Sequence, residues 1–334
     1  MLIGLALASL LNAGSLMKTA KDLPFGSTKR SVAVGVMTPV HWIAETLRID
    51  APRERIDTAL GHGPVTTIDP FATPAASSST TTTTTPRTTQ PGETTTTGEP
   101  TTTTTAPQVP SRQASPKNPL RIWVAGDSLS AEFGNSLYRL AAETGEITPL
   151  DIVDFRISTG LARPDKFNWP AEIASRTRAL DPEVVVLMFG SNDDQTIQSP
   201  DGDNHPFGTD GWQKEYGRRV GAVMDQTIAG GRYVVYVGVP ILENGGRNPH
   251  YLLINSIIAS EAKARVGKAW YVDAYTLFQG ADGNYAQYLA NDDGQLVEMR
   301  TGDGIHFQRA GADRLARRTL EVMARPFAID SYRG

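Results

Sequence analysis

A serine in a sharp polar turn is the first residue of this chain whose type and setting could do chemistry. Ser128 lies in "VAGDSLSAEFG", residues 124–134, where an apolar run ends at Gly126 and a helix-like stretch follows. A serine hydroxyl becomes a nucleophile when a neighbouring base takes its proton. The competing interpretation is that Asp127, Ser128 or Ser130 caps the helix, because their side-chain oxygens accept bonds from free N–H groups. The choice depends on what else the chain places beside Ser128.

A second polar stretch, "GDGIHF" at residues 302–307, contains the two partners that a serine nucleophile needs. His306 is the candidate base, because an imidazole takes a proton from the attacking hydroxyl near neutral pH and returns it to the leaving group. Asp303 is the candidate for orienting that imidazole and stabilising its charged form. The plainer alternatives are that His306 caps the following helix or lies on the surface, and that Asp303 is a turn residue beside Gly302 and Gly304.

Alternating strand-like and helix-like stretches predict the scaffold that positions these residues. Short runs rich in Val, Ile and aromatic residues are typical of buried parallel strands, and helix-like stretches lie between them. Strands that alternate with helices predict a three-layer α/β/α domain with a parallel five-stranded sheet. The predicted strands are residues 121–126, 151–157, 183–190, 232–240 and 269–274. The predicted helices are residues 131–144, 170–180, 211–229, 250–266 and 308–325.

Polar residues follow several of these predicted strands. Ser128 follows the first strand, Gly160 in "ISTGLARP" follows the second, and Asn192 in "FGSNDD" follows the third, while Asp303 and His306 precede the last helix. The carboxyl ends of parallel strands share one edge of the sheet, where such folds bind their ligands. We therefore expect these residues to converge on one site.

The set of blocks resembles the SGNH hydrolases, also called the GDSL family. The resemblance covers about 200 residues, from Arg121 to Phe327, and leaves the first 118 residues unexplained. It implies a flavodoxin-like fold and a serine hydrolase that needs no cofactor and no metal. The matching blocks are "GDSL" with Ser128, the glycine Gly160, "GSND" with Gly190 and Asn192, and "DGIH" with Asp303 and His306.

The resemblance also implies an oxyanion hole for the tetrahedral intermediate. Its donors would be the backbone N–H groups of Ser128 and Gly160 and the side-chain amide of Asn192. Gly160 could instead serve a turn that needs positive φ, and Asn192 an Asx turn. The neighbouring Asp193 and Asp194 are interpreted as solvated loop carboxylates.

Composition and short patterns exclude several other functions. The net charge of −4 and the absence of a Lys/Arg cluster argue against a nucleic-acid partner, and the chain has no cysteine for disulfides or thiolate metal sites. Residues 199–211 carry alternating Asp residues but lack the glycine and glutamate of an EF-hand loop, so no metal is predicted. No glycine-rich nucleotide pattern is present. The aromatic residues Phe167, Trp169, Phe207 and Trp212 could line a substrate pocket or pack in the core.

The first part of the chain has the composition of a membrane-directing segment. Residues 2–17, "LIGLALASLLNAGSLM", carry no charge and are followed by Lys18 and Lys21. An uncleaved membrane anchor (residues 1–17), a cleaved signal peptide and a buried globular helix are the alternatives. Residues 18–71 are predicted to be a juxtamembrane helical region, with a candidate helix at residues 36–47.

A Thr- and Pro-rich tract separates this region from the predicted hydrolase domain. Residues 72–118 contain almost no large apolar side chain and cannot build a core, so a disordered stalk is predicted there. The hydrolase domain is predicted at residues 119–334. An apolar start followed by such a tract indicates an extracytoplasmic head, anchored to a membrane or secreted if the segment is cleaved.

The function predicted from these observations is that of an extracytoplasmic serine esterase. Its expected substrate is an O-acyl ester, in particular an acetyl ester on a cell-envelope glycan, hydrolysed through an acyl-enzyme. Two alternatives stay open. An O-acyltransferase would use the same triad with a sugar hydroxyl as acceptor, and a non-catalytic module could bind an envelope polymer on the same fold.

Overall fold

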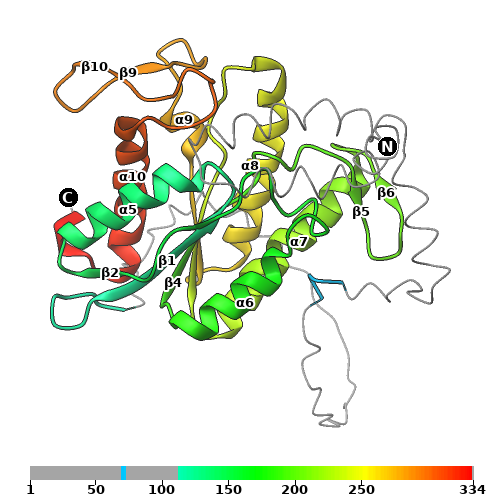
Figure 1. Ribbon diagram of the computed structural model, residues 1–334, viewed down its shortest axis with the longest axis horizontal. Coiled ribbons are helices and arrows are strands. Elements are labelled where there is room, and N and C mark those ends of the chain that lie inside the picture. The colour runs from blue at the N-terminus through cyan, green and yellow to red at the C-terminus, as the bar shows by residue number, and fades with distance from the viewer. Residues whose placement is uncertain (1–68, 73–111, 333–334) are drawn as a thin grey trace, which may run out of the picture. The chain divides into compact units, whose positions relative to one another are not determined.

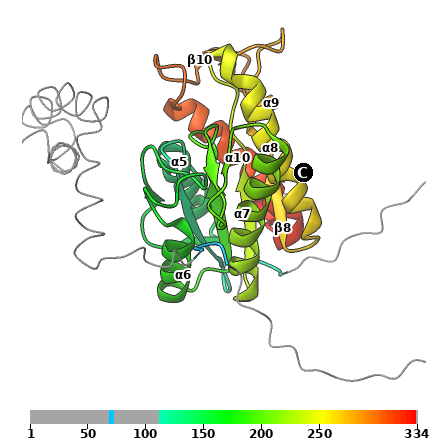
Figure 2. The same cartoon turned by 90° about the vertical axis from the view of Figure 1, so that its right-hand side faces the viewer.

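The computed structural model describes residues 69–72 and 112–332, and they form an α/β fold with helices on both faces of a parallel sheet. Helices α5 and α10 pack against each other on one face, and α6, α7 and α8 cover the other (Figures 1 and 2). The sheet strands are β1 (Leu120–Gly126), β2 (Ile147–Pro149), β3 (Asp154–Phe155), β4 (Val184–Met188), β7 (Tyr233–Val237) and β8 (Ala269–Val272). The main helices are α5 (Ser130–Glu143), α6 (Trp169–Leu180), α7 (Asp210–Ala229), α8 (Asn248–Ala264) and α10 (Arg309–Phe327).

The order of the strands is β2-β1-β4-β7-β8, and every neighbouring pair is parallel. This is the flavodoxin-like order, in which the chain reverses direction beside the first strand. All five residues of β4 are buried, as expected for a central strand covered on both faces. The predicted three-layer fold class is therefore confirmed, and each predicted helix is present within a few residues of its expected bounds.

The second predicted strand differs from the structure. Instead of one strand over residues 151–157, two short strands, β2 and β3, pair in turn with the first and last parts of β1. Between them Asp151 adopts a positive φ of 55°, and Ile152 is 72% exposed. The chain therefore leaves the sheet edge and rejoins it, so the sheet has six strands in five positions. The apolar side chains at residues 152 and 157 suggested a continuous buried strand, but both are exposed.

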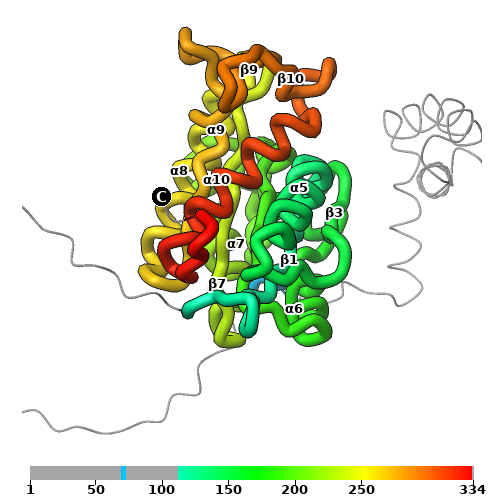
Figure 3. Tube along the Cα trace, turned by 90° about the vertical axis from the view of Figure 1, so that its left-hand side faces the viewer, coloured from blue at the N-terminus to red at the C-terminus, as the bar shows by residue number. Residues whose placement is uncertain are grey.

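Smaller elements lie at the edges of the domain. A two-stranded hairpin projects beside the start of α10, as Figure 3 shows, and α10 runs alongside α5 below it. A second two-stranded pair lies in the loop at residues 197–205, which the sequence did not predict. These elements are the hairpin strands β9 (Tyr288–Ala290) and β10 (Leu296–Glu298), the pair β5 (Ile197–Gln198) and β6 (Asn204–His205), the short helix α9 (Ala274–Leu277), and the 3-10 turns η1 (Gly245–Arg247) and η2 (Asp330–Tyr332).

Two segments that precede β1 pack on the folded unit. Phe71 is 3% exposed, and Ala114 is 2% exposed and donates its N–H to the carbonyl of Phe327 at 2.8 Å. Arg112 pairs with Glu183 at 2.5 Å. The folded unit thus includes residues 69–72 and 112–118, which precede the predicted domain start. The predicted anchor, the candidate helix at 36–47 and most of the Thr-rich tract lie outside the described residues.

Within the part of the chain that the structure describes, no helix has the length and apolar character needed to cross a membrane.

Candidate active site

The turn between β1 and α5 presents Ser128 at the carboxyl end of the sheet. A Cβ on Gly126 would lie 2.3 Å from the carbonyl oxygen of Met188, so the end of β1 fits against β4 only as glycine. Helix α5 begins after Leu129 without a side-chain cap. Of the three capping candidates, only Asp127 accepts a backbone N–H among the described residues, from Leu129 at 2.9 Å, so the capping interpretation is wrong for Ser128 and Ser130.

The Ser128 hydroxyl lies beside the imidazole of His306 instead. The distance from Ser128 Oγ to His306 Nε2 is 3.0 Å, and His306 Nδ1 lies 2.6 Å from Asp303 Oδ2. The serine and histidine are 178 positions apart in the chain. This is the geometry required of a nucleophile, a base and a group that orients the base.

The hydrogen bonds that Asp303 accepts favour its ionised form. Its Oδ1 accepts hydrogen bonds from Thr301 Oγ1 at 2.6 Å and from the backbone N–H groups of Ile305 and His306, which leaves Oδ2 for the imidazole. Partial burial opposes ionisation, but the hydrogen bonds from His306, Thr301 and the backbone hold the pKa of Asp303 well below its usual range. The carboxylate is therefore ionised near neutral pH, where it can stabilise an imidazolium.

A buried arginine closes the loop that carries the histidine. Arg300 is fully buried and donates to the carbonyls of Ile241, at 2.8 Å, and of Ile305. The ring of Phe307 lies 5.0 Å from its guanidinium carbon, and burial lowers the pKa of Arg300 to about 10. No motif in the sequence indicates this role. Arg300 ties the His306 loop to the segment that follows β7.

The three predicted oxyanion donors lie on neighbouring loops. The backbone N–H groups of Ser128 and Gly160 donate to no other group among the described residues. The amide nitrogen of Asn192 donates to the carbonyl of Thr159 at 2.9 Å and to Ser191 Oγ at 3.2 Å. The amide of Asn192 therefore lies beside the loop that contains Gly160.

A buried carboxylate links the Ser128 loop to the Asn192 loop. Asp127, 1% exposed, accepts from Leu129 N at 2.9 Å through one oxygen and from Ser191 Oγ at 2.7 Å through the other. Burial raises the pKa of Asp127 to about 6, against the lowering effect of these hydrogen bonds. Asp127 therefore fixes the spacing between the Ser128 loop and the Asn192 loop.

Because the pKa of Asp127 is higher in the folded than in the unfolded chain, its contribution to stability depends on pH. The contribution is complete below the ordinary value of 3.8 and is lost as the pH rises through about 6. Asp127→Asn removes this dependence. The difference in unfolding free energy between wild type and Asp127→Asn should therefore shift by about 1 kcal/mol in favour of the variant from pH 5 to pH 8. Urea denaturation at both pH values measures the shift, and the exposed Asp201→Asn should show none.

Asp193 lies in an environment that differs from the one predicted from the sequence. It was predicted to be solvated, but it is completely buried and accepts from Leu161 N at 3.1 Å, Ala162 N at 2.9 Å and Tyr216 OH at 3.0 Å. Burial raises its pKa. A Cβ on Gly160 would lie 2.1 Å from Asp193 Oδ1, and Gly160 has no positive φ. Gly160 is therefore glycine because the carboxylate approaches it, not because a turn needs positive φ.

Asp194 also differs from the prediction of a solvated carboxylate. Its side chain is 12% exposed and is held by Arg247, with the ring of His250 at 3.1 Å. Arg247 also donates to the carbonyl of Ser191 at 3.2 Å. Arg247 therefore holds the Asn192 loop through the residues on both sides of Asn192, Ser191 and Asp194.

The aromatic residues proposed as pocket candidates belong largely to the core. Trp169 and Trp212 are fully buried, and their indole N–H groups donate to Thr159 Oγ1 at 3.0 Å and to the carbonyl of Gln195 at 2.8 Å. The pocket interpretation is wrong for these two. Phe167 and Phe207 are partly buried and pack edge-on against them. Trp169 therefore supports the loop that contains Thr159 and Gly160, and Trp212 supports the loop that contains Asn192 and Gln195.

The loop at residues 199–211, examined for calcium, forms the turn between β5 and β6 and the start of α7. Among the described residues, no three His, Asp or Glu side chains are grouped so that they could hold a metal ion.

Comparison with known proteins places the chain in a family. A family described as "Protein of unknown function (DUF459)" matches residues 121–322, which is more than half of the chain. The chain belongs to the DUF459 family. The DUF459 match includes all five predicted site residues, Ser128, Gly160, Asn192, Asp303 and His306. No curated protein sequence matches the chain.

Several solved structures are similar to this DUF459 protein. An acetyl xylan esterase from Geobacillus stearothermophilus is 14% identical with a TM-score of 0.45, and the match covers 64% of this chain and 96% of that one. A family 3 carbohydrate esterase from Clostridium thermocellum is 15% identical with a TM-score of 0.41, covering 64% and 99%. A GDSL-like lipase from Bacteroides thetaiotaomicron is 16% identical with a TM-score of 0.39, covering 63% and 88%.

Proposed function

We propose that this protein is a serine ester hydrolase of the SGNH type that works through an acyl-enzyme. The observation that carries the proposal is the single imidazole of His306, which lies 3.0 Å from Ser128 Oγ and 2.6 Å from Asp303 Oδ2. A helix-capping or turn role explains neither distance.

The proposed reaction has two halves. His306 Nε2 takes the proton of Ser128 as Oγ attacks the ester carbonyl, and Asp303 stabilises the imidazolium that forms. The tetrahedral oxygen accepts bonds from the N–H groups of Ser128 and Gly160 and from the amide of Asn192. The imidazolium then protonates the leaving alcohol. In the second half His306 Nε2 deprotonates water, which attacks the acyl carbonyl. The bond from that carbonyl to Ser128 Oγ then breaks, and the imidazolium returns its proton to Oγ as the acid leaves.

The proposed substrate is an acetyl ester on a cell-envelope glycan, and the proposed location is extracytoplasmic. The exposure of the site supports a bulky substrate, because the side chains of His306 and Asp303 are 41% and 48% exposed. The apolar residues 2–17 support the location. The same exposure favours hydrolysis over acyl transfer, because a transferase must keep water from its acyl-enzyme.

A covalent inhibitor tests the proposal directly. The full chain is treated with a fluorophosphonate, and the labelled peptide is identified by mass spectrometry. We expect one adduct, on Ser128, and parallel loss of hydrolysis of a chromogenic acetyl ester. A folded protein that forms no adduct and hydrolyses no ester would contradict the proposal and favour a binding module.

Asn192→Ala should lower kcat by about 10²- to 10³-fold, because it removes one of the three proposed oxyanion donors. The effect should fall on kcat rather than KM, since the donor acts on charge that develops during attack. Steady-state hydrolysis of the chromogenic ester measures both constants. Asn284→Ala is the control, because Asn284 is exposed and its side-chain amide donates to the exposed Asp282 at 3.0 Å. A loss of less than about threefold would remove Asn192 from the proposed oxyanion hole.

A further inference from the structure

A four-residue segment far from the active site in the sequence is docked on α7. Asp69 pairs with Arg218 at 2.8 Å and accepts from the N–H of Phe71 at 3.0 Å. The carbonyl of Phe71 accepts from Arg218 at 3.3 Å. The side chain of Phe71 is 3% exposed, so the segment is held by one aromatic anchor and one ion pair.

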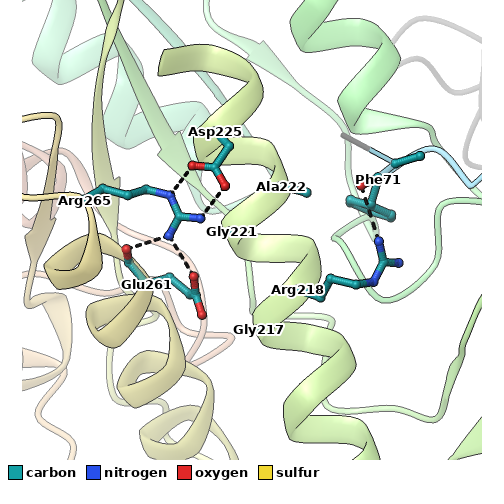
Figure 4. A pocket seen from close by; sticks show the side chains of 9 residues that line it. Phe71, Gly217, Arg218, Gly221, Ala222, Asp225, Glu261 and Arg265 are labelled. Atoms are coloured by element: carbon teal, nitrogen blue, oxygen red, sulfur yellow. Dashed lines mark hydrogen bonds and ion pairs between the residues drawn. The ribbon is translucent and has the colours of Figure 1, made fainter. Parts of the chain in front are cut away.

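The docking site is one end of a groove along α7. The groove has a volume of about 460 Å³, and Phe71 and Ala72 form part of its wall. Gly217 and Gly221 line the groove one helical turn apart on α7, and neither has a side chain that would fill it (Figure 4). At the other end Arg265 pairs with Asp225 and Glu261, as Figure 4 shows.

Phe71 covers a buried arginine. Arg219 is 3% exposed, and the ring of Phe71 lies 5.1 Å from its guanidinium carbon. Glu215 accepts from Arg219 Nε at 2.7 Å. An aromatic face over a guanidinium attracts the charge and excludes water from it.

Arg219 in turn holds the loop that contains Gly160. Its Nη1 donates to the carbonyls of Leu161 and Ala162, both at 2.9 Å. The N–H groups of these same two residues donate to Asp193, the carboxylate packed against Gly160. The peptide units that follow Gly160 are thus held on the carbonyl side by Arg219 and on the N–H side by Asp193.

We propose that Asp69–Ala72 is an intrachain docking segment and that Phe71, acting through Arg219, is a positioning residue for the oxyanion loop at Gly160. For its effect on catalysis this rests on the proposed function. Removing the ring admits water to Arg219, and water then competes with the carbonyls of Leu161 and Ala162 for its N–H groups. Hydrogen bonds of a charged group weaken as the local dielectric rises. The Gly160 N–H then loses its fixed direction.

Phe71→Ala in the full chain tests the proposal with two independent measurements. Hydrogen exchange of the Leu161 and Ala162 amides should accelerate by about tenfold, because local opening becomes easier. The kcat for the chromogenic ester should fall by about three- to tenfold with KM within twofold, because the donor loop is less well placed. Phe71→Tyr keeps a ring over the guanidinium and should restore both values to within twofold of wild type.

The matched control is Leu252→Ala, which removes an apolar side chain that is 50% exposed on α8. It should change neither measurement. Exchange and kcat in Phe71→Ala equal to those of this control would overturn the proposal, and so would faster exchange with unchanged kcat. If wild type hydrolyses no ester while Phe71→Ala still accelerates exchange at Leu161 and Ala162, the proposed function fails and the docking stands.

Discussion

Ser128→Ala is expected to lower kcat for ester hydrolysis by about 10⁴- to 10⁶-fold, the largest effect of any substitution considered for this protein. The variant keeps the candidate oxyanion donors and His306, but it has no oxygen that can form the acyl-enzyme. The remaining rate comes from a water molecule that reaches the bound ester directly.

The measurement is single-turnover and steady-state hydrolysis of the chromogenic acetyl ester, with the melting temperature as a check on folding. Ser136→Ala is the matched control, because Ser136 is buried on α5 and its hydroxyl has no partner among the described residues. The control should retain wild-type kcat. Retention of more than about a tenth of the activity by Ser128→Ala would show that another group is the nucleophile.

Asp303→Asn is expected to lower kcat by about 10⁴-fold. Asp303 Oδ1 accepts three hydrogen bonds, from Thr301 Oγ1 and from the N–H groups of Ile305 and His306, so the single oxygen of an asparagine will take that place. The amide nitrogen then faces His306 Nδ1 and donates to it. This moves the imidazole proton to Nε2, which can no longer accept the proton of Ser128.

The substitution removes the charge of Asp303 and its acceptor toward His306, but it keeps an oxygen for the loop N–H groups. The asparagine variant should fold and bind the ester with KM within a few-fold of wild type, because its contacts to the loop backbone persist. The turn residue Asp203→Asn makes the same chemical change on an exposed side chain and should leave kcat unaltered. If Asp303→Asn keeps most of the activity, Asp303 neither orients His306 nor stabilises its charged form.

Periodicity and local composition predicted the scaffold because each helix and each central strand is specified by its own residues. The five buried residues of β4 are all apolar, and α7 begins after Thr209, whose side chain accepts from Trp212 N. The edge strand was mispredicted because pairing there depends on which part of the chain meets β1. Local pattern does not contain that information.

The candidate triad was predictable because its residue types occur in characteristic blocks, whereas the groups that support it were not. Asp193 contacts Leu161 across 32 positions, and Arg218 contacts Asp69 across 149. The partners of these charged residues are therefore set by contacts that are distant in sequence. In sequence, Asp193 and Asp194 are adjacent carboxylates, and only the fold buries the first completely while pairing the second with Arg247.

Residues 69–72 and residues 112–118 both pack on the same folded unit, so the described residues on either side of the Thr- and Pro-rich sequence belong to one domain. In sequence, residues 73–111 are thus an insertion within that unit. Closing such a loop costs only about 0.6 kcal/mol more for each doubling of its length. Relatives can therefore lengthen or shorten this insertion at little thermodynamic cost to the fold.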